Sequence, residues 1–83
     1  MEKKTYKLGG GNEFITDNPA TISEIEAAET ELLRKGELNE DPKFAKYYDR
    51  IKNDLEYRNK KVISYVMAGR SKAQAKKEKE NNK

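Results

Sequence analysis

The chain has 83 residues and a mass of 9.6 kDa, and 34% of its residues are hydrophobic against 40% charged, which predicts one small domain with a thin core. It contains no cysteine and no histidine, so disulfides, thiol nucleophiles, the commonest general base and the usual transition-metal ligands are excluded. No apolar run is long enough for a signal peptide or a membrane span, which, with the lack of cysteine, favours a cytoplasmic protein that does not enter membranes.

The net charge of +3 is distributed unevenly along the chain. Residues 1–69 hold 12 Lys plus Arg and 13 Asp plus Glu, whereas residues 70–83 hold 6 and 2. Because the body has no general positive field, nucleic-acid binding would depend on the tail or on a local stripe of basic residues.

The first predicted element is a β-hairpin, because two short alternating runs flank the glycines at 9–11. A loop made of the three glycines would pair Tyr6 with Phe14, whereas a four-residue loop would pair Tyr6 with Ile15. An isolated two-stranded hairpin is only marginally stable in water, so this one must pack on another element.

The first helix is predicted to begin at Thr21, which stands three residues before Glu24 in the spacing of a capping box. Apolar residues then follow at helical spacing, with acidic residues in the early turns and basic residues in the last. Gly36 is the predicted C-terminal stop.

The second helix is predicted to begin at Pro42, with Asp41 as its cap, and to run without interruption to Met67 or Ala68. Arg58 fills a gap in its apolar stripe. The stripe consists of Phe44, Tyr48, Ile51, Leu55, Val62, Tyr65 and Val66.

The predicted fold is therefore α+β and mainly α: a ββαα domain over residues 1–69, with an antiparallel two-helix hairpin, followed by a flexible basic tail over residues 70–83. The tail is either a continuation of the second helix or a disordered arm, and its lysine-rich composition favours the arm.

The first helix is too short to cover the whole second helix, so Val62 and Val66 meet either the hairpin or another chain. The hairpin is favoured, because apolar helical stripes are usually core.

No catalytic, cofactor or metal site is predicted. The carboxylates lie among lysines on helices, which is typical of a solvated charged face. The glycines at 9–11 are not followed by the Gly-Lys-Ser/Thr of a phosphate-binding loop.

The leading hypothesis is a small non-enzymatic protein-interaction module, whose long helix binds a larger, unidentified cellular protein or a second copy of the chain. Tyr and Arg supply large contact areas in such interfaces. The candidate contacts are Arg58, Val62, Tyr65, Val66 and Met67, provided that the hairpin leaves this stretch open. The Lys, Glu and Asn richness is typical of small proteins of low-GC Gram-positive bacteria and their phages, which suggests an accessory or modulator role in a phage or mobile element.

A rival hypothesis is nucleic-acid binding, because basic residues interleave with tyrosines between positions 43 and 61, although acidic residues dilute the field. The candidate contacts are Lys43, Lys46, Arg50, Lys61, Arg70, Lys72, Lys76 and Lys77. A third possibility is a structural or assembly protein that self-associates through the apolar stripe.

Overall fold

The computed structural model describes residues 3–81, with side chains through Ala73. The elements in chain order are β1 (Lys4–Gly9), β2 (Asn12–Thr16), α1 (Pro19–Leu38), the 3-10 turn η1 (Pro42–Phe44), α2 (Ala45–Asn53) and α3 (Leu55–Asn81). The predicted class, an N-terminal antiparallel hairpin in a mainly helical chain, is confirmed. The described residues form three α-helices where two were predicted.

The hairpin has the register predicted for a glycine loop, since Tyr6 pairs with Phe14. All three glycines have positive φ angles, of 90°, 63° and 81°, in the region that favours glycine over other residues. The rings of Tyr6 and Phe14 lie on the same face of the hairpin, with centroids 6.5 Å apart.

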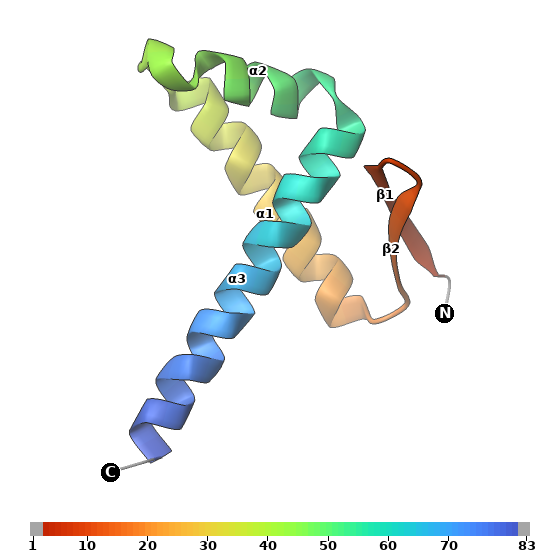
Figure 1. Cartoon of the computed structure of the whole chain (residues 1–83), viewed down its shortest axis with the longest axis vertical. Coiled ribbons are helices and arrows are strands. Elements are labelled where there is room, and N and C mark those ends of the chain that lie inside the picture. Colours follow the sequence, from red (N-terminus) through yellow and green to blue (C-terminus); the bar gives the residue numbers. More distant parts are fainter. Residues whose placement is uncertain (1–2, 82–83) are drawn as a thin grey trace.

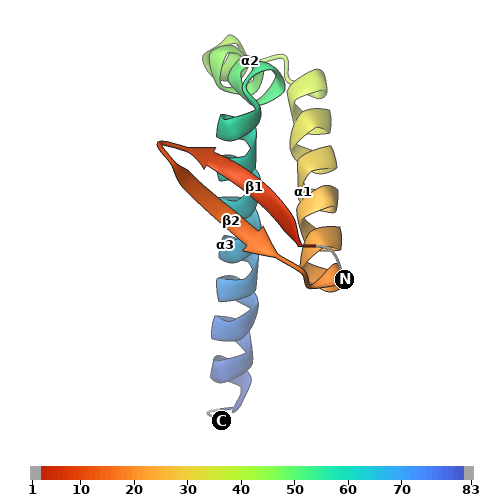
Figure 2. The same cartoon turned by 90° about the vertical axis from the view of Figure 1, so that its right-hand side faces the viewer.

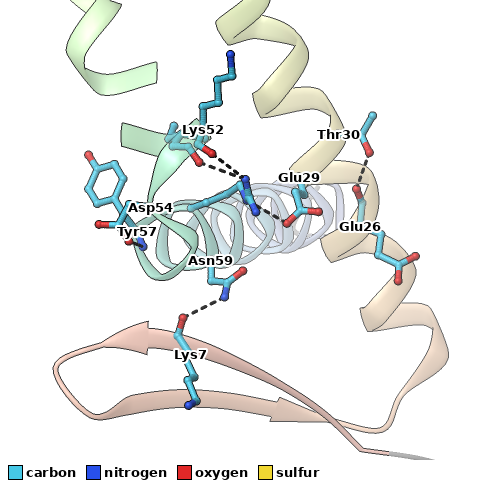
Figure 3. A network of polar contacts seen from close by, with 10 residues as sticks. Lys7, Glu26, Glu29, Thr30, Lys52, Asp54, Tyr57 and Asn59 are labelled. Carbon is cyan, nitrogen blue, oxygen red and sulfur yellow. Dashed lines mark hydrogen bonds and ion pairs between the residues drawn. The ribbon is translucent and has the colours of Figure 1, made fainter. Parts of the chain in front are cut away.

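The hairpin lies across α1 and α3, as Figure 2 shows. Its inner face supplies Tyr6 to the core, and the Asn59 side chain of α3 donates from Nδ2 to the Lys7 carbonyl at 3.0 Å (Figure 3). Asn59 is buried, so this bond attaches β1 to α3 where water has little access.

Helix α1 begins before its predicted start, because Asn18 caps it and Pro19 occupies the first helical position. The Asn18 Oδ1 atom accepts a hydrogen bond from the Ala20 amide at 3.0 Å. Thr21, the predicted cap, is instead buried.

The predicted end of α1 at Gly36 is also wrong, because the helix continues to Leu38. The glycine has a packing role: a Cβ at this position would lie 3.2 Å from the Cβ and Cδ1 atoms of Tyr48. Gly36 therefore allows α2 to approach α1 closely.

The prediction of one uninterrupted second helix is wrong, because the chain bends at Asp54 (Figure 1). Asp54 has extended backbone angles, φ −117° and ψ 103°, and ends α2. Its Oδ1 atom accepts a hydrogen bond from the Tyr57 amide at 3.1 Å, as a cap of α3 (Figure 3). The residue thus ends one helix and starts the next.

Arg58 holds this bend together. Its Nη1 atom donates to the carbonyls of Ile51 and Lys52, at 3.5 Å and 3.3 Å, at the C-terminal end of α2. Its Nε atom lies 3.3 Å from the Glu29 carboxylate of α1, without the geometry of a hydrogen bond (Figure 3). One guanidinium therefore contacts all three helices.

The core lies where α1 and α3 cross beneath the hairpin. Ile63, which the helical spacing assigns to the polar side, is buried in it at 8% exposure. The core residues are Tyr6, Ile25, Ala28, Leu32, Val62, Ile63 and Val66. Val62 and Val66 are therefore buried with Tyr6 of the hairpin and residues of α1, as the favoured arrangement required, whereas Tyr65 stays exposed.

Helix α3 continues beyond Gly69 to Asn81, so the backbone of residues 70–81 follows the helical arrangement considered for the tail. The separation of a 1–69 domain from an independent tail stays a prediction. The side chains of Lys76 and Lys77 lie outside the described residues.

Candidate functional site

The five predicted protein contacts do not form one surface. Val62 and Val66 are core residues, with exposed fractions of 1% and 6%, so their assignment as partner contacts is wrong for this fold. Arg58 is engaged at the helix bend, and Met67 is partly buried against the core. Only Tyr65 is well exposed, and its hydroxyl donates to a Glu31 carboxylate oxygen at 3.3 Å.

Two of the predicted nucleic-acid contacts, Arg50 and Lys61, lie close together, because the bend at Asp54 brings residues of α2 and α3 together. The Arg50 guanidinium lies 4.0 Å from the centroid of the Tyr57 ring. The Lys61 ammonium lies 5.2 Å from the same ring and 5.9 Å from the Tyr47 ring. We call the group formed by Tyr47, Arg50, Tyr57 and Lys61 the aromatic–cationic corner.

The tyrosines of the corner pack edge to face. The Tyr47 ring lies 6.2 Å from Tyr57 and 5.1 Å from Tyr48, with interplanar angles of 80° and 67°. Partial burial, followed by the neighbouring phenols Tyr57 and Tyr48, raises the pKa of Tyr47 above its ordinary value. The rings thus help to fix α2 on α3 and hold the cations in place.

Of the three acidic residues in the basic stripe, one is directed away from the corner and two stay beside it. Asp49 lines the cavity between α1 and α2. Glu56 lies between the hairpin turn and the corner: a Cβ on Gly9 would be 3.3 Å from its Oε2 atom, and it lines a pocket together with Arg50. Asp54 lines the same pocket, with its Oδ2 atom 3.7 Å from the Arg50 Nε atom.

Further lysines extend the positive surface. Lys43, Lys46 and Lys60 are exposed, and none has a described carboxylate within 4.0 Å. Lys60 was not predicted as a nucleic-acid contact, because Glu56 precedes it by four residues, the spacing of a helical ion pair. In the structure Glu56 lies against the hairpin turn instead.

Arg70, another predicted nucleic-acid contact, is paired with α1, and 44% of its side chain remains exposed. Its Nε and Nη2 atoms donate to the Glu24 carboxylate at 3.1 Å, and Nη2 also donates to the Thr21 hydroxyl at 3.0 Å. The paired carboxylate raises the pKa of the guanidinium further. Arg70 therefore ties α3 to the start of α1, whereas Lys72 is exposed on the following turn.

A second feature is an open groove between α1 and α3, with a volume of about 400 Å³. Small residues make up nearly half of its lining, and Tyr65 and Arg70 also line it. The small residues are Ala27, Ala28, Gly69 and Ala73.

Among residues 3–73, whose side chains the structure describes, no three Asp or Glu side chains gather as they would to hold a metal ion. Within the same part of the chain, no helix combines the length and apolar character needed to cross a membrane. No protein-family model, curated protein or solved structure matches the chain.

Proposed function

We propose that this protein binds nucleic acid, without catalysing a reaction, through the aromatic–cationic corner. The observation that carries the proposal is that Arg50 of α2 and Lys61 of α3 lie at the same tyrosine ring, Tyr57. Cationic side chains bind phosphates, and tyrosine and arginine planes stack on bases, so one surface offers both kinds of contact.

The charge distribution supports this proposal. Residues 43–61 hold seven Lys plus Arg, six of them besides Arg58, which pairs with Glu29, against three Asp plus Glu, whereas residues 19–38 hold two against five. Three of the acids of α1 are neutralised internally, since Glu24, Glu26 and Glu29 pair with Arg70, Lys4 and Arg58. The positive charge left on α2 and α3 can then attract a phosphate backbone.

Lys43, Lys46, Arg50 and Lys61 together can neutralise about four phosphates, so log K should fall with log salt concentration with a slope of about −3 on a single strand. Fluorescence anisotropy with a labelled single strand and a labelled duplex, from about 50 to about 200 mM salt, measures this slope.

Lys46→Glu and Lys61→Glu should weaken binding and flatten the salt slope. Lys35→Glu is the matched control, because Lys35 lies on α1, beside Glu31 and the Tyr65 ring. A lack of binding to either nucleic acid at about 50 mM salt, or equal losses in all three variants, would overturn the proposal.

Protein binding remains a second candidate function, favoured by the groove between α1 and α3. Small residues in its lining allow the backbone of a partner helix to approach closely. A Cβ on Gly69 would meet no atom within 4 Å, so Gly69→Leu should fill the groove without disturbing the fold.

Affinity purification of tagged protein from the native host, compared between the wild type and Gly69→Leu, tests this second candidate. A partner that is recovered equally with both would exclude the groove. Size-exclusion chromatography with light scattering shows whether that partner is a second copy of the chain. A cytoplasmic location and an accessory role in a phage or mobile element are consistent with either function and stay part of the proposal.

A further inference from the structure

A pocket of about 550 Å³ lies between the hairpin turn and the aromatic–cationic corner. Arg50, Tyr57 and Lys60 line it from the helices, and Gly10 and Asn12 line it from the turn. Its volume falls within the roughly 300–1,000 Å³ of ordinary small-ligand sites.

One wall of this pocket is a planar group that is already in position. The inner face of the Arg50 guanidinium is covered by the Tyr57 ring at 4.0 Å, while 62% of the Arg50 side chain remains exposed. The ring is itself held by Tyr47. A guanidinium fixed in this way loses little freedom when a second flat group stacks on its open face.

The rest of the lining can contact the edges of a nucleobase. The Asn12 amide is both a donor and an acceptor, and the Asp54 and Glu56 carboxylates accept from exocyclic amino groups. These contacts need a base whose face and edge are both free. A paired base in a duplex offers neither, whereas an unpaired base can be turned out of its strand.

We infer that the ligand is single-stranded nucleic acid, with one unpaired base stacked on Arg50 in this pocket and the adjoining phosphates on Lys60 and Lys61. The inference rests on the proposed function of the same corner. A strand fits better than a free nucleotide, because exposed Lys46 lies one helical turn before Arg50 on α2 and can contact a phosphate next to the stacked base.

The test compares three labelled ligands with strands of equal length: a single strand, a blunt duplex without unpaired bases, and a strand that is abasic at every position. The wild-type protein should prefer the intact single strand to both others by at least about fivefold, the effect expected from stacking of one base. Arg50→Lys keeps the charge and removes the plane. It should lose most of that preference, so that its affinities for the three ligands approach one another.

Equal affinity of the wild type for all three ligands would overturn the inference and leave the proposed function standing. The same holds if Arg50→Lys, shown to be folded by circular dichroism, keeps the single-strand preference. A lack of binding to every ligand at about 50 mM salt removes the proposed function as well, so the two failures are distinguishable.

Discussion

Replacement of Arg58 by methionine should destabilise the fold strongly, although Arg58 lies in a polar part of the structure. Its side chain is 20% exposed and contacts the last carbonyls of α2 and the Glu29 carboxylate of α1. Methionine fills similar space and removes these polar contacts. The carbonyls of Ile51 and Lys52 would then lack this donor at the end of α2.

The expected loss of stability can be estimated from the lengths of the Arg58 contacts. A hydrogen bond from a charged donor contributes about 1.5–3 kcal/mol, and the two long bonds of Arg58 together contribute about 2 kcal/mol. The Glu29 side chain is 37% exposed, so the ion pair adds less than about 1 kcal/mol. The free energy of unfolding should therefore fall by about 2–3 kcal/mol, which lowers the Tm of so small a domain by about 10–20 °C.

Urea and thermal unfolding followed by circular dichroism measure this loss. Arg34→Met is the control, because Arg34 is exposed on α1 and has no described carboxylate within 4.0 Å. If both variants unfold at the same urea concentration, Arg58 does not hold the bend. Arg58 would then be available to contact a protein partner, as predicted from the sequence.

Three further substitutions test the packing. Val62→Ala should lower the free energy of unfolding by about 2 kcal/mol, because Val62 is 1% exposed. Ser64→Ala is the control: Ser64 is exposed, so its replacement should change the free energy of unfolding by less than about 0.5 kcal/mol. Similar losses of stability in the two variants would contradict the burial of Val62. Asn59→Ala should cost about 1–3 kcal/mol and speed hydrogen exchange in the hairpin, and unchanged exchange would show that the Lys7 bond does not anchor it. Burial raises the pKa of Tyr47, so the unfolded chain loses this proton first as pH rises, and stability falls above the ordinary phenol value of about 10. Urea midpoints at about pH 9 and about pH 11 should differ less in Tyr47→Phe than in the wild type, and an equal alkaline loss would refute this contribution.

Part of the candidate site could be predicted from the sequence. Arg50, Tyr57 and Lys61 belong to the predicted run of basic residues and tyrosines between positions 43 and 61, and the bent chain brings them together. The bend itself was missed, because the spacing from Ile51 to Leu55 continues a helical stripe. A signal was present, since Arg58 stands where the stripe needs an apolar residue and Asp54 is a capping residue type.

Local chemistry determined the hairpin and the helical character of the rest of the chain. Three consecutive glycines accept positive φ angles, so a turn at this point follows from neighbouring residues alone. Two registers were compatible with the sequence, and the structure has the one that pairs Tyr6 with Phe14. Tertiary structure decided which apolar residues are core. Val62 is buried and Leu55 is 57% exposed, although both belong to the predicted stripe and both lie in α3, because Leu55 stands at the bend and Val62 lies in the core with residues of the hairpin and α1. Burial depends on contacts between residues far apart in the chain, and helical spacing describes only one helix at a time.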